Sequence, residues 1–215
     1  MIAALAYYFH TDTLLFRVIA FLIAATVHDA VHSAAALAVG DRTAREQGRL
    51  SLNPLAHIDA LGLAMLLFGP YGWTKPLPVA AQRRRERLLV YAAGPAASLL
   101  LGMFFWWLYF SLPAVAGADM PNSAWIAALR GVLQYCIIVN LMYGVVHILP
   151  FYPLDGAGML KTILPPAAQP FWQKYEKFGL IVTLILFISP VGQSLLERVY
   201  QYIAQWVMNI FAFPM

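Results

Sequence analysis

The stretch His28-Asp29-Ala30-Val31-His32 places two histidines and a carboxylate inside an otherwise apolar run, residues 14–39. A run of this length crosses a bilayer as one helix, because about 20 apolar residues suffice. In a helix, two histidines four positions apart lie on the same face. Ionisable groups at membrane depth are costly and usually functional. The segment therefore predicts a membrane-spanning helix that carries a polar site.

The composition agrees with a membrane protein. Of the 215 residues 61% are hydrophobic and 11% are charged, whereas a soluble domain carries about 25% charged residues. A single cysteine excludes a disulfide scaffold. The net charge of +4 does not indicate nucleic-acid binding, because no basic stretch is interleaved with base-stacking aromatic residues. The lipid bilayer is the expected surrounding.

Further apolar runs predict an all-α polytopic membrane protein with about 4–6 transmembrane helices. Residues 88–112 and 131–149 each form a candidate span. Residues 178–190 and 195–213 form either two spans or one span followed by an interfacial helix. No sequence repeat and no low-complexity tract divides the chain, so residues 1–215 are expected to form a single integral-membrane domain.

The basic residues predict the orientation. They gather just after the first span and just before the second, whereas the connection 111–123 has none. Cytoplasmic loops carry the excess of Lys and Arg, so both basic loops are expected in the cytoplasm. Between them, residues 60–73 are too few to cross the membrane twice. The region 47–80 is therefore expected to be re-entrant or to form a small membrane-associated β-sheet.

The histidine pair, with an acid beside its first member, is typical of the helical half of a zinc site. Such a site needs a third protein ligand and leaves a fourth position for water. The remaining attractive carboxylate is Asp155, in a loop at 150–158 where two prolines break the helix and an adjacent glycine permits a tight turn. His28 lies about 16 Å of helix from the cytoplasmic end of its span, on the side where Asp155 emerges. As alternatives to metal binding, the two histidines pack between helices, and Asp155 with the glycine after it only forms a turn.

These residues resemble the site-2 protease family of intramembrane zinc metalloproteases, in its compact form without a periplasmic sensor domain. The resemblance rests on several motifs in order: the histidine pair, Gly40-Asp41-Arg42-Thr43-Ala44, Gly48-Arg49-Leu50-Ser51-Leu52-Asn53-Pro54, His57-Ile58-Asp59, Trp73-Thr74-Lys75-Pro76-Leu77-Pro78-Val79, Ala93-Gly94-Pro95 and Pro153-Leu154-Asp155-Gly156. It implies a helical membrane core with a short sheet after the metal helix 14–39. It also implies that His28, His32 and Asp155 bind a zinc ion (Zn2+), that the substrates are transmembrane segments of other proteins, and that the protein is multi-pass in a bacterial cell membrane.

The sequence departs from the family pattern at three positions near this site. Asp29 stands where the family has Glu, and its carboxylate falls back by roughly 1.5 Å. With the shorter acid, three outcomes are open for peptide hydrolysis: the activity falls, a bridging water preserves it, or a shift of the helix restores it. His147 stands where the family usually has Asn. Its expected role is that of a hydrogen-bond donor, an extra metal ligand or a packing residue. Ser98, also in place of Asn, is expected to pack between helices, and His57 to make a structural hydrogen bond.

The resulting hypothesis is metal-assisted peptide hydrolysis within the membrane. Asp29 is the candidate acid and base, and His147 or Asn140 is the candidate oxyanion donor. Asn140 can instead bond across helices. The alternative is a pseudoprotease of the same fold that binds membrane proteins without cutting them. A transporter or channel also fits the composition, but it predicts inverted repeats with paired broken helices, which the sequence lacks.

Overall fold

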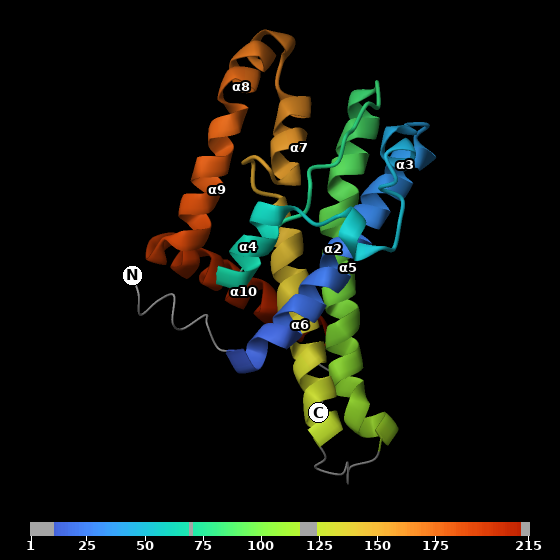
Figure 1. Cartoon of the computed structure of the whole chain (residues 1–215), viewed down its shortest axis with the longest axis vertical. Coiled ribbons are helices and arrows are strands. Elements are labelled where there is room, and N and C mark those ends of the chain that lie inside the picture. Colours follow the sequence, from blue (N-terminus) through green and yellow to red (C-terminus); the bar gives the residue numbers. More distant parts are fainter. Residues whose placement is uncertain (1–10, 69–70, 117–123, 212–215) are drawn as a thin grey trace.

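Three long helices form the body of the molecule. The structure is a computed structural model that describes residues 11–68, 71–116 and 124–211. Within these ranges α2 (Thr11–Ala38), α5 (Arg84–Ala116) and α6 (Ala124–His147) pack against one another (Figure 1). All three are long and apolar enough to cross a membrane. The expectation of an all-α polytopic membrane protein is confirmed.

Helix α2 lies close to its neighbours because its inner face is built from small residues. Ala20, Ala24, Ala25 and Ala36 are fully buried, and small residues let membrane helices approach closely. The helix ends at Gly40, whose φ of +88° is left-handed. The Gly40 and Asp41 backbone N–H groups donate to carbonyls of the last turn, as in a Schellman cap. This ending turns the chain into the first basic loop.

The segment after α2 contains short helices and no sheet in the part that the structure describes. It holds α3 (Thr43–Glu46), the 3₁₀ turn η1 (Pro54–Ala56) and α4 (Ala60–Phe68). The expectation of a small β-sheet here is wrong, because a single antiparallel bridge joins Ile58 to Thr74. Prolines near both sides of the bridge lack the N–H groups that a ladder needs. At nine residues, α4 is about 13 Å long and too short to cross a bilayer.

The C-terminal third forms a bent arm beside the three long helices. After α6, a loop leads into α7 (Asp155–Ile163), and η2 (Pro166–Ala168), α8 (Gln169–Tyr175), η3 (Glu176–Phe178) and α9 (Gly179–Ile188) follow as one nearly continuous run. This run bends by 78° into α10 (Pro190–Phe211), which lies across the bundle (Figure 1). The bent pair counts as at most one further span, which gives up to four in the described ranges. The outer connection 111–123 falls partly outside the described residues.

An aromatic and aliphatic cluster fixes the arm to the rest of the molecule. Trp73 and Phe187 are both buried and their ring centroids lie 5.9 Å apart. Leu196 of α10 joins the same cluster together with Met142 and Val146 of α6. As a result α10 is held against α6 on the side of the molecule where α4 lies.

Candidate metal centre

Three ligand-type side chains meet between α2, α5 and the start of α7. The Nε2 atoms of His28 and His32 lie 3.1 Å apart. Asp155 Oδ2 lies 3.0 Å from His28 Nε2, and Asp155 Oδ1 lies 3.1 Å from His32 Nε2. One ligand atom from each residue fits within 4.8 Å of the others. The structure thus brings together the three residues that the sequence predicts as ligands, although they come from positions 127 residues apart.

The opposite edges of both imidazoles are held by hydrogen bonds. His32 Nδ1 lies 2.5 Å from the carbonyl oxygen of Val90, and His28 Nδ1 lies 2.9 Å from Ser98 Oγ. Gly94, on the same helix as these two partners, makes room for the rings, since a Cβ there would overlap His32 Nε2 and lie 2.7 Å from His28 Nε2. Contacts of this kind orient the histidines of metal sites and fix their tautomers.

The donor chemistry of this group fits a metal ion. A carbonyl oxygen only accepts, so His32 Nδ1 carries the proton that it donates to Val90. In the neutral ring Nε2 then holds a lone pair, and it faces a second Nε2 atom and a carboxylate. Such electron-rich atoms, 1–10% exposed, need a positive charge among them. A cation bound by all three side chains supplies it.

His147 supports the carboxylate of Asp155 from the end of α6. Its Nδ1 donates to Asp155 Oδ2 over 2.7 Å. Its ring stacks on Tyr143, with centroids 4.1 Å apart, and meets the His28 ring edge-on at 4.4 Å. Its Nε2 is buried and has no hydrogen-bond partner in the described ranges. Two of the three alternatives for His147, a hydrogen-bond donor and a packing residue, describe these contacts.

Asp29 faces the segment after α2 with both carboxylate oxygens engaged. Oδ1 accepts from the Thr74 hydroxyl at 2.9 Å. Oδ2 accepts from the Arg49 guanidinium and lies 3.1 Å from His57 Nδ1. Asp29 is only 2% exposed, so this ring of donors compensates a carboxylate that would otherwise be very costly to bury. Through these contacts Asp29 connects α2 to both ends of the segment 49–74.

Sequence reasoning placed some of these side chains and missed others. His57 makes the predicted structural hydrogen bonds, to Asp29 and to the Ser51 carbonyl. Asn140 donates a hydrogen bond to the Cys136 carbonyl of its own helix at 2.8 Å. In the described residues it has no hydrogen bond to the metal group, that is, to His28, His32 or Asp155. Arg49 and Tyr143 also contact side chains of the site, and they are not among the site residues predicted from the sequence. The signal for Arg49 is available in the sequence, because a buried acid requires a cationic partner.

The fold and these contacts define a class of protein, namely a multi-span helical membrane protein with a buried His-His-Asp metal-type centre. The sequence is 32% identical over 192 residues to "Putative zinc metalloprotease YwhC" of Bacillus subtilis (strain 168). The aligned region covers 88% of this chain and 87% of that protein. The chain belongs to the zinc metalloprotease family of YwhC. No family model matches the sequence, and no solved structure matches the chain.

Proposed function

We propose that this chain is an intramembrane zinc metalloprotease of the site-2 type, which hydrolyses peptide bonds in transmembrane segments of other membrane proteins. The convergence of His28, His32 and Asp155 inside a bundle of membrane-length helices carries the proposal. Membership of the YwhC family supports zinc as the metal. The basic loops favour a multi-pass protein of the bacterial cell membrane with this centre in the cytoplasmic half of the bilayer.

In this proposal His28, His32 and Asp155 hold the ion, and Ser98 and Val90 keep the two imidazoles aligned. Three protein ligands leave one coordination position free, as catalytic zinc sites require. Zinc in such a site acidifies water and polarises the carbonyl that is to be cleaved. The protein supplies the remaining tasks through the residues around it.

His147 can hold and move a proton next to the ion. Since Nδ1 donates to Asp155, Nε2 of the neutral ring carries a lone pair. This nitrogen is buried and unpartnered among the described residues, so it can accept a proton. Once protonated, it can donate to the carbonyl oxygen of a bound substrate, which is the predicted role of an oxyanion donor.

Asp29 is the predicted base and proton carrier. An ionised carboxylate offers about four acceptor positions, and Arg49, His57 and Thr74 occupy three of them. One position is left to accept a proton from water and return it to the leaving amine. Asp29 thus retains the capacity for the predicted chemistry, at a carboxylate that the surrounding donors hold in place.

The same contacts favour a second candidate function. A carboxylate that is one methylene shorter than Glu and bound by three donors is well suited to a structural role. The chain would then be a pseudoprotease that binds transmembrane segments without cutting them. The two functions differ in whether a zinc-loaded protein hydrolyses peptide bonds.

The test is cleavage by purified protein in vesicles, with a panel of single-span substrates that carry helix-destabilising residues. We expect about one zinc per chain by elemental analysis, cleavage by the wild type, and loss of both in Asp155→Ala. Arg45→Gln, at an exposed position of the first basic loop, is the control and should change neither value. A zinc-loaded wild type that cuts no member of the panel would sink the protease proposal.

Asp29→Glu then separates the two functions. If Asp29 carries the proton, lengthening its side chain by one methylene changes the cleavage rate strongly in either direction, because the acid must lie within hydrogen-bonding reach. For a pseudoprotease, neither the wild type nor Asp29→Glu cleaves while both bind zinc.

A further inference from the structure

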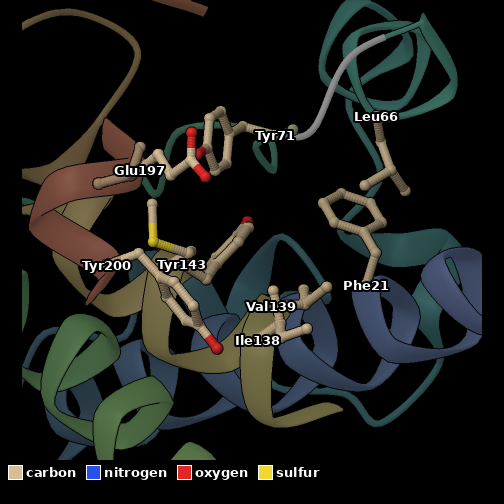
Figure 2. A pocket seen from close by; sticks show the side chains of 11 residues that line it. Phe21, Leu66, Tyr71, Ile138, Val139, Tyr143, Glu197 and Tyr200 are labelled. Atoms are coloured by element: carbon tan, nitrogen blue, oxygen red, sulfur yellow. The ribbon is translucent and has the colours of Figure 1, made fainter. Parts of the chain in front are cut away.

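A cavity of about 430 Å³ lies beside Tyr143 (Figure 2). Its walls come from α2, α4, α6 and α10, and they include Phe21, Leu66, Ile138 and Val139. Tyr143 separates the cavity from the metal group, since its ring lines the cavity, stacks on His147 and meets the His28 ring with centroids 4.9 Å apart. A side chain that occupied this cavity would be separated from the proposed metal centre by the ring of Tyr143 alone.

The cavity lies at membrane depth. The residues that α6 contributes run from Ile138 to Val146, all inside a span that ends at His147. At 1.5 Å per residue, Ile138 lies about 13 Å deeper than the end of that span. On the opposite wall, α10 is held at this level because Leu196 packs in the same cluster as Met142 and Val146. Of two neighbouring residues on α10, Leu196 is buried, whereas Glu197, which lines the cavity, is exposed.

Glu197 is the charged side chain among the described residues that line the cavity. Figure 2 shows its carboxylate extending from α10 toward Tyr71 at one edge of the space. In the described ranges no Lys, Arg or His side chain forms an ion pair with it. An ionisable residue at membrane depth is expensive and normally has a partner. The Glu197 carboxylate is exposed, so a charged group of a bound segment can reach it.

We propose that Glu197 recognises a basic side chain of the bound transmembrane segment, so that the preferred substrates carry a lysine or arginine near the bond that is cut. The inference rests on the proposed function and adds the class of substrate. Apolar walls suit the aliphatic stem of such a side chain, while the carboxylate at the edge pairs with its charged end. When a bound segment covers the cavity, a close charge pair with Glu197 favours a basic side chain over a neutral one.

Binding to wild-type protein in the presence of a chelator tests this without requiring cleavage. The probes are fluorescent Leu/Ala transmembrane peptides in lipid bicelles, with a single lysine that moves by one residue at a time over a helical turn. Matched peptides carry methionine or glutamate at the same position. At the best register we expect lysine to bind about tenfold more tightly than methionine. Glu197→Gln should abolish this advantage, and Glu197→Lys should transfer it to the glutamate peptide.

Arg198→Gln is the matched control, because Arg198 follows Glu197 on α10 but does not line the cavity, and it should keep the lysine preference. Equal affinities of lysine and methionine peptides at every register would overturn the inference, as would a preference that survives Glu197→Gln. Cleavage of the same peptides by the zinc-loaded protein is read separately. Cleavage without a lysine preference contradicts only this inference, and a lysine preference without cleavage contradicts only the protease proposal.

Discussion

At the scale of single residues, the contacts of the metal group depend on hydrogen bonds that pass between helices. Ser98 lies on α5 and His28 on α2, and the serine hydroxyl lies 2.9 Å from the Nδ1 atom of the imidazole. Both side chains are 1% exposed. The expectation that Ser98 merely packs between helices is incomplete, because its hydroxyl also orients a proposed ligand. Partners of this kind tune metal affinity as well as geometry.

Ser98→Ala should weaken zinc binding by about 10–100-fold, since His28 loses the group that fixes its ring. The measurement is competition for zinc against a chromogenic chelator in detergent. Thr26→Ala is the control, because the Thr26 hydroxyl bonds the Leu22 carbonyl within α2 and should leave the affinity unchanged. If the two variants bound zinc equally well, Ser98 would have only the packing role.

At the scale of elements, the loop before α5 is pinned to the end of α2. Asp41 follows the glycine cap of α2, and its Oδ2 accepts the backbone N–H of Ala80 at 2.6 Å, while Oδ1 accepts that of Thr43 at 3.0 Å. Partial burial alone would raise the pKa of Asp41. The hydrogen bonds from Thr43, Ala80 and Ala81 outweigh that effect, and the pKa lies below its ordinary value. The ionised carboxylate therefore joins the end of α2, the start of α3 and the loop before α5.

This contact predicts how stability depends on pH. A carboxyl whose pKa is lower in the folded state stabilises the protein above its unfolded pKa of about 3.9, and this contribution is lost as the pH falls through the folded value. Asp41→Asn should therefore unfold at a lower temperature than the wild type at pH 6, and the difference should shrink as the pH falls below about 4. Thermal unfolding in detergent across this range measures it. A difference that stays constant with pH would contradict the role of the ionised group.

At the scale of the whole molecule, the helices place the basic loops and the proposed metal centre at the same end. Arg42 and Arg45 follow the cap of α2, and Arg84, Arg85 and Arg87 begin α5. Gly94, which contacts both histidines, lies about two turns after Arg87 on α5. At 1.5 Å per residue the metal group is about 10 Å below Arg87. If the basic loops face the cytoplasm, the metal group lies in the cytoplasmic half of the bilayer.

Cysteine labelling tests this orientation. Cys136 is the only cysteine of the chain and is fully buried, so Cys136→Ala provides a background without thiols. In intact cells a membrane-impermeant thiol reagent should label Trp125→Cys at the start of α6, and it should label Arg45→Cys only after permeabilisation. The reverse pattern would place the metal group in the outer half of the membrane.

The long helices, their membrane setting and the three candidate ligands could be predicted from the sequence. In lipid a long apolar run has to be helical because its backbone must satisfy its own hydrogen bonds. The spacing of His28 and His32 is then fixed by the helix, and composition is enough to exclude a soluble fold. The expected β-sheet was wrong, because local sequence does not distinguish a single bridge from a paired strand.

The surroundings of Asp29 and His147 depend on the tertiary structure. The partners of Asp29, namely Arg49, His57 and Thr74, are 20, 28 and 45 residues away, and no periodicity relates them. His147 donates to Asp155 because the loop after α6 returns that carboxylate to within 2.7 Å. Local patterns follow from the geometry of one helix, whereas these contacts depend on how separate segments pack. The free energy of burying charge then selects which of the packed side chains become partners.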